Sequence, residues 1–172
     1  MKFLAVFSIF CFAWPALAQT PSSAHVNSLL KYRLGISDGR WEITGADSKG
    51  KPCSIVVNLE SGQISFYKGD DEDDDGLTYK FLGNDGASIV DNARTDENGL
   101  YLHSRKDAGD VGNAEFEFTL SLEKVASVKV GANIKGILGF GGKFGDQRSC
   151  HLISEPRSVP TFKSIWKRFR GK

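Results

Sequence analysis

The sequence has few of the motifs that indicate catalysis. Its Ser-x-x-Lys sequences stand without the other motifs of penicillin-binding enzymes. Its three histidines are not spaced as metal ligands. The glycine-rich stretch 131–145 is not a phosphate loop, because Ile137 replaces a required glycine and Phe144 stands where a Ser or Thr must bind magnesium. We therefore expect a non-enzymatic protein.

Long hydrophobic runs are also missing, except near the start of the chain. The run from Phe3 to Trp14 follows the positive Lys2 and is too short to span a membrane. The small residues that signal peptidase needs follow at Ala16 and Ala18. The sequence predicts a signal peptide over 1–18, cleavage after Ala18, and a periplasmic or secreted location. Cys11 lies inside the apolar run, so a lipid anchor is not expected.

Cysteine is scarce, and Cys11 is lost with the signal peptide. Cys53 and Cys150 remain as a pair in an exported chain, where conditions favour oxidation. No Cys-x-x-Cys or Cys-His metal motif is present. His151 follows Cys150 directly, but adjacent residues of a strand point to opposite faces, so it is poorly placed to activate the sulfur. We predict a Cys53–Cys150 disulfide.

A strong charge of either sign is absent as well. The chain is 40% hydrophobic and 25% charged with a formal net charge of +1, which excludes a disordered polymer, a collagen and a coiled coil. Lys2 is the only charged residue of the first 18, so the mature chain has no net charge. We expect no nucleic-acid partner.

What the sequence does contain is a series of short alternating segments separated by turn signals. The clearest is Glu115–Leu122, with four apolar side chains on one face and four polar ones on the other. Turn signals such as Ser61-Gly62 and Asn98-Gly99 separate such segments. The pattern predicts a mainly β domain over 39–155: an antiparallel up-and-down β-barrel, or alternatively a two-sheet sandwich, with about 7–9 strands. The segments are too short for a membrane barrel.

A short helix is expected in the N-terminal segment 19–38. Val26, Leu29, Leu30 and Leu34 recur at helical spacing after Ser22, and Gly35 can end the helix. We interpret this helix as a brace on one end of the β domain.

An acidic run at 70–75 is the first candidate site. Asp71, Asp73 and Asp75, followed by Gly76, fit the first half of a calcium loop. The closing glutamate is missing, because Leu82 occupies its position. Two interpretations stay open: a weak Ca²⁺ site, as the one possible cofactor, and a solvated hairpin loop.

The basic tail 156–172 is the second candidate. It is predicted to form a short amphipathic helix that binds an anionic membrane surface or an acidic partner, or packs on its own β domain. The residues expected to make these contacts are Phe162, Lys163, Ile165, Trp166, Lys167, Arg168, Phe169 and Arg170.

One stretch of the chain resembles a known family. Gly39–Ile43, followed by Cys53–Leu59, is similar to the opening of the small periplasmic inhibitors of bacterial metalloproteases, which are eight-stranded barrels with one disulfide. The second cysteine lies much later here than in that family, so the inhibitor's binding residues are not transferred.

These observations predict an exported, soluble, non-enzymatic binding protein. The first hypothesis is a lipocalin-like mode, in which the barrel mouth and the basic tail bind a small apolar ligand or the envelope surface. The glycine-rich stretch would then border the mouth. The alternative is a protein-binding module, such as an inhibitor of a secreted protease or another enzyme, with an envelope or secreted protein as partner.

Overall fold

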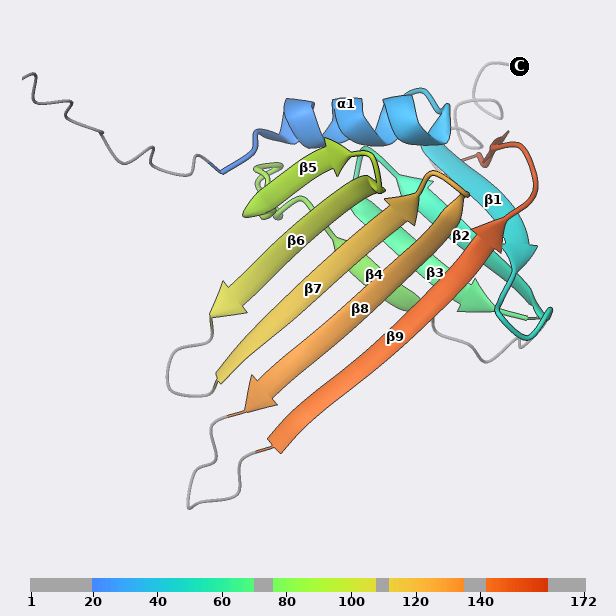
Figure 1. Cartoon of the computed structure of the whole chain (residues 1–172). Coiled ribbons are helices and arrows are strands. Elements are labelled where there is room, and N and C mark those ends of the chain that lie inside the picture. Colours follow the sequence, from blue (N-terminus) through green and yellow to red (C-terminus); the bar gives the residue numbers. More distant parts are fainter. Residues whose placement is uncertain (1–19, 70–75, 108–111, 135–141, 161–172) are drawn as a thin grey trace, which may run out of the picture.

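The protein folds around one antiparallel β-sheet. The computed structural model describes residues 20–69, 76–107, 112–134 and 142–160 (Figure 1). Its elements are α1 (Ser23–Leu34), β1 (Arg40–Ala46), β2 (Pro52–Asn58), β3 (Gln63–Lys68), β4 (Leu77–Lys80), β5 (Asn92–Asp96), β6 (Gly99–Asp107), β7 (Gly112–Ser121), β8 (Val125–Ile134), β9 (Gly142–Leu152) and β10 (Arg157–Ser158).

Within the described residues the sheet has 10 strands in the order β4-β3-β2-β1-β9-β8-β7-β6-β5, with β10 paired to β1. All the pairs between these strands are antiparallel. Figure 1 shows β6 to β9 as a near layer with β2 to β4 behind it. The predicted mainly β, antiparallel fold is therefore confirmed, and β10 lies inside the segment predicted as a tail.

The predicted closure into a barrel is not seen among the described strands. The ladder ends at β4 and β5, which have 4 and 5 residues and do not pair with each other. The chain between them, residues 81–91, crosses the remaining gap as a loop with a single backbone bridge, Leu82 to Ser88. Short edge strands joined in this way leave part of the sheet margin without a neighbour.

The core lies between the two layers and follows the period-two pattern. Ile55 and Val57 of β2, Leu102 of β6 and Phe118 of β7 belong to one core cluster, and all four are fully buried. One residue of the predicted alternating segment Glu115–Leu122 does not follow the pattern. Leu122 is 60% exposed, because β7 ends at Ser121 and Leu122 lies in the turn to β8.

The predicted N-terminal helix is confirmed as α1. The Ser22 hydroxyl accepts a hydrogen bond from the backbone N–H of His25 at 3.2 Å, and Gly35 ends the helix with φ 66°. Val26, Leu30 and Leu34 are buried, and α1 crosses one end of the sheet (Figure 1). No helix in the described part of the chain is long and apolar enough to cross a membrane.

The predicted disulfide is also confirmed. The Sγ atoms of Cys53 on β2 and Cys150 on β9 are 2.02 Å apart, although β1 lies between these strands in the sheet. The bridge crosses β1 at Gly45, where a methyl group would lie 2.0 Å from the His151 carbonyl oxygen and 3.0 Å from the Cys150 sulfur. A residue without a side chain is therefore required at this crossing.

Candidate ligand-binding site

An apolar hollow among the described residues lies where the sheet is left open. This β4–β6 cavity has a volume of about 610 Å³ and lies between β4 and the far end of β6. Small-molecule pockets typically measure about 300–1,000 Å³, so the cavity is large enough for a small organic ligand. Its lining comes from β4, β6, β7 and the loop 81–91.

The lengths of the strands explain why the cavity is there. β5 pairs with β6 only from Gly99 to His103, so residues 104–107 of β6 extend beyond the end of β5. On the opposite margin, β4 is paired to β3 alone among the described strands. The two margins face each other without a strand between them, and the cavity fills that gap.

The inner end of the cavity is closed by a buried polar pair. The Tyr79 hydroxyl of β4 and the Ser104 hydroxyl of β6 are 2.8 Å apart, which joins the two margins at this point. Burial raises the pKa of the Tyr79 phenol above its usual range, and the bond to Ser104 opposes that shift. Behind this pair the Tyr79 and Phe118 rings stack with centroids 6.2 Å apart. The base of the cavity at Ser104 is therefore held by a hydrogen bond to the opposite margin.

The loop 81–91 is held against β6 by contacts on the outer surface. His103 Nδ1 lies 2.5 Å from Asp91 Oδ1, and the backbone N–H of Asp91 donates to the His103 carbonyl at 3.0 Å. The His103 ring stacks on Tyr101, whose other partner is the Arg94 guanidinium 4.6 Å from the ring centroid. His103 is thus a structural residue that fixes one wall of the cavity.

The walls of the β4–β6 cavity combine apolar and cationic groups. Leu82, the half-buried Phe116 and Ile89, which is 43% exposed, supply apolar surface. The cationic residues of the lining are Lys80, Arg105 and Lys106, and no described lining residue is acidic. This combination fits a ligand with an apolar body. The exposed side chains of the lining show that the cavity is open to water.

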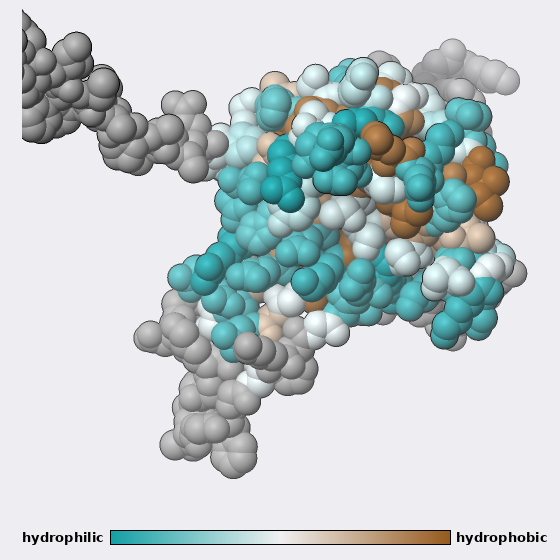
Figure 2. Space-filling view, viewed as in Figure 1, coloured by the Kyte–Doolittle hydropathy of each residue, from teal (hydrophilic) through white to brown (hydrophobic). Residues whose placement is uncertain are grey.

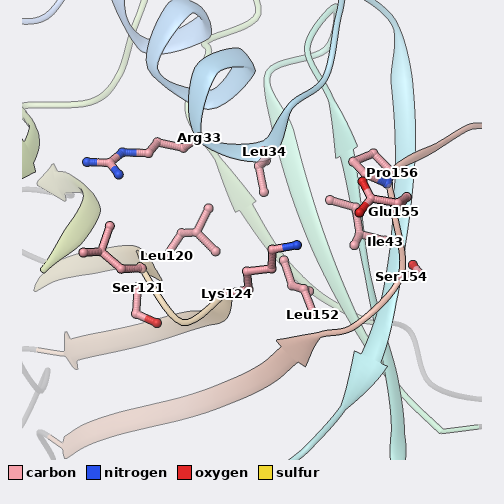
Figure 3. A pocket seen from close by; sticks show the side chains of 11 residues that line it. Arg33, Leu34, Ile43, Leu120, Ser121, Lys124, Leu152, Ser154, Glu155 and Pro156 are labelled. Atoms are coloured by element: carbon pink, nitrogen blue, oxygen red, sulfur yellow. The ribbon is translucent and has the colours of Figure 1, made fainter.

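A second hollow, the helix-end cavity, lies at the other end of the domain (Figure 3). It measures about 180 Å³ between the end of α1, the β7–β8 turn and the chain after β9. Leu34, Ile43, Leu120 and Leu152 form its apolar surface. Arg33 also lines it, but its guanidinium donates to the Thr95 hydroxyl at 2.8 Å. This cavity is below the usual size of a ligand pocket.

The visible surface separates into polar and apolar parts (Figure 2). Hydrophilic residues cover most of the outer face of β6 to β9, and hydrophobic residues gather toward the end where α1 lies. Leu122 and Ile153 are 60% and 69% exposed near that end. Two isolated exposed aliphatic residues are common in soluble proteins and do not define a site.

Most of the predicted site residues lie outside the described part of the chain. This holds for Asp71, Asp73 and Asp75, for the tail residues from Phe162 to Arg170, and for the centre of the glycine-rich stretch. The calcium site and the tail's contacts with membrane or partner stay predictions. Among the described residues no group of three or more His, Cys, Asp or Glu side chains is arranged to hold a metal.

The β4–β6 cavity was not predicted from the sequence, although β6 carries a signal of it. Alternate residues of this strand change from apolar Leu100 and Leu102 to Ser104 and Lys106. Where the alternate residues on the core-facing side of a strand change from apolar to polar, that side of the strand no longer packs against the core. That change locates the end of the core on β6, but it does not show which other segments lie opposite.

Comparison with known proteins adds little to this description. No family model matches the chain, and no curated protein matches it. Among solved structures, the crystal structure of Treponema pallidum Pallilysin is similar over 73% of this chain and 82% of that chain, with 16% identity and a TM-score of 0.33. A similarity at that TM-score establishes neither fold nor function.

Proposed function

We propose that this protein is an exported, non-enzymatic binding protein that holds a small apolar ligand in the β4–β6 cavity. The observation that carries the proposal is the position of an apolar hollow of about 610 Å³ at the open margin of the sheet. A ligand seated there would occupy the gap between β4 and β6 and complete a barrel-like enclosure. This is a lipocalin-like mode of binding in its geometry.

Two features favour this site for ligand binding. Ile89 and Phe116 present apolar surface that water reaches in the free protein. Covering such surface stabilises a complex by about 25 cal/mol for each Å² removed from water. The Tyr79–Ser104 hydrogen bond and the His103–Asp91 contact hold the walls in place before binding. A site whose walls are already ordered loses less entropy when it binds.

The other predicted partners are independent of this cavity. Binding of the envelope surface depends on the tail residues from Phe162 to Arg170, and the inhibitor alternative depends on a protein surface. Any truncation that tests the tail should begin after Pro160, because Arg157 and Ser158 form β10 and pair with β1.

The proposal predicts that an acidic residue in the cavity wall weakens ligand binding. We expect Ile89→Asp to weaken binding of the neutral fluorescent probe 1-aminoanthracene by about tenfold or more, because the probe would have to bury a carboxylate. Probe fluorescence, titrated against mature protein, measures this affinity. The exposure of Ile89 makes the substitution tolerable for the fold.

Ile153→Asp is the matched control, because it places the same charge on an aliphatic residue that is 69% exposed and outside the cavity. It should bind the probe like the unaltered protein. Equal affinities of all three proteins, with unchanged circular dichroism, would contradict the assignment of the cavity. Failure of the unaltered protein to bind any apolar probe would contradict the proposed function.

A further inference from the structure

We infer that the ligand of the β4–β6 cavity is a single-chain amphiphile with an anionic head group, such as a medium-chain carboxylate. The inference rests on the proposed function and adds the chemistry of the head group. The observations that carry it are the positions of two lysines at the cavity, the absence of carboxylates from its described lining, and the amount of apolar space beside the lysines.

The first lysine lies on the inner face of β6. Lys106 follows Leu102 and Ser104 at alternate positions, and both of those side chains are buried. Alternate residues of a strand share a face, so Lys106 continues the core-facing series at the point where the sheet opens. Lysine is disfavoured on a core-facing series unless its ammonium group reaches water or an anion.

The second lysine approaches from the opposite margin. Lys80 is the last residue of β4 and lines the same cavity. The two ammonium groups therefore belong to strands on either side of the gap, and both residues are exposed. An anion at the cavity would have a cationic residue on each of the two margins.

Neither lysine is neutralised in the described part of the chain. On the outer face of the sheet, cations have carboxylate neighbours: Lys129 Nζ is 3.6 Å from Glu117, Arg105 is 3.9 Å from Glu115, and Arg94 is 3.8 Å from Asp96. No described carboxylate lies within ion-pair distance of Lys80 or Lys106. Among its described lining residues the cavity thus has cationic side chains and no carboxylate.

The apolar part of the cavity defines the rest of the ligand. Leu82, Ile89 and Phe116 lie beside the two lysines, so a bound anion would have apolar surface next to it. A small hydrophilic anion such as phosphate would leave that surface wet. A chain of methylene groups would cover it, and each buried methylene tightens binding by about fourfold at about 0.8 kcal/mol. A volume of about 610 Å³ suits one such chain.

Competition experiments with matched ligands test the inference. Dodecanoate and 1-dodecanol have the same chain length and differ in head-group charge, and each can displace 1-aminoanthracene from the mature protein at about pH 8, where a carboxylate is ionised. We expect dodecanoate to bind about fivefold tighter at low salt, the upper range for exposed ion pairs. The preference should shrink as salt screens the charges.

The double variant Lys80→Gln, Lys106→Gln should bring the ratio of the two affinities to about one, because it removes the charges and keeps the apolar walls. Its affinity for 1-dodecanol should not change. Lys124→Gln is the matched control, because Lys124 lines the helix-end cavity. This single variant should keep the full preference for dodecanoate.

Each other outcome has a defined meaning. Equal binding of dodecanoate and 1-dodecanol by the unaltered protein overturns the anionic head group and leaves the apolar site intact. Loss of the preference in Lys124→Gln moves the anion to the helix-end cavity and also overturns the inference. Binding to phosphatidylglycerol vesicles without binding of monomeric dodecanoate overturns a single-chain ligand. Binding of neither dodecanoate nor 1-dodecanol contradicts the proposed function itself.

Discussion

Replacing both disulfide cysteines, Cys53→Ser with Cys150→Ser, is expected to lower the free energy of unfolding by about 4–5 kcal/mol. The bridge joins residues 97 positions apart, so it removes a large loop entropy from the unfolded chain. It also ties β2 to β9 across β1, where the described β1–β9 ladder consists of only two residue pairs. A domain of ordinary stability, about 5–15 kcal/mol, would keep only a small margin.

Urea unfolding of the mature protein, followed by circular dichroism, measures this loss. The double variant is preferred to a single one because it leaves no free thiol. A reductant should destabilise the unaltered protein by a similar amount and leave the double variant unchanged. A difference below about 1 kcal/mol between variant and unaltered protein would show that the cross-link contributes little to the fold.

Truncating the central aromatic residue, Phe118→Ala, is the second large effect and should cost about 3–5 kcal/mol. The Phe118 ring is fully buried and lies 6.2 Å from the ring centroids of both Phe66 and Tyr79. These three rings join β3, β4 and β7 behind the base of the β4–β6 cavity. Removing the Phe118 ring leaves a void. The Phe66 and Tyr79 rings could fill it only by adopting unfavourable side-chain conformations.

Phe116→Ala is the matched control for this prediction. Phe116 lies two positions earlier on the same face of β7, but it is only half-buried at the cavity. We expect it to cost about 1 kcal/mol of stability and to weaken binding of the apolar probe, with both measured on the same samples. Equal losses of stability in the two variants would show that the core extends to Phe116 and that the cavity is not a separate site.

Local features of the fold could be predicted from the sequence because they depend on neighbouring residues. The Ser22 cap, the buried face through Val26, Leu30 and Leu34, and the Gly35 stop are all encoded within one short segment. The Cys53–Cys150 bridge could be predicted because these two cysteines remain as a pair once the predicted signal peptide is removed. Leu122 was misassigned because alternation alone does not show where a strand ends, and β7 ends one residue earlier.

The open margin of the sheet and the β4–β6 cavity could not be predicted in this way. Both depend on which distant strands become neighbours, such as β1 with β9, and on how far β6 extends past β5. Lys80, Ile89 and Lys106 come from three separate segments, and none of them stands in a motif. The acidic run and the basic tail were predicted as sites because their charged residues are close together in the sequence. The residues that line the β4–β6 cavity are close together only in space.

The most direct test of the ligand-binding account is an NMR titration of isoleucine-methyl-labelled mature protein with 1-dodecanol. Ile89 lines the β4–β6 cavity and Ile43 lines the helix-end cavity, so one spectrum reports on both. The account predicts a saturable shift of the Ile89 methyl signals and nuclear Overhauser contacts between them and the ligand chain, with Ile43 and Ile153 unchanged. Contacts at Ile43 without contacts at Ile89, or no saturable shift at any isoleucine, would contradict it.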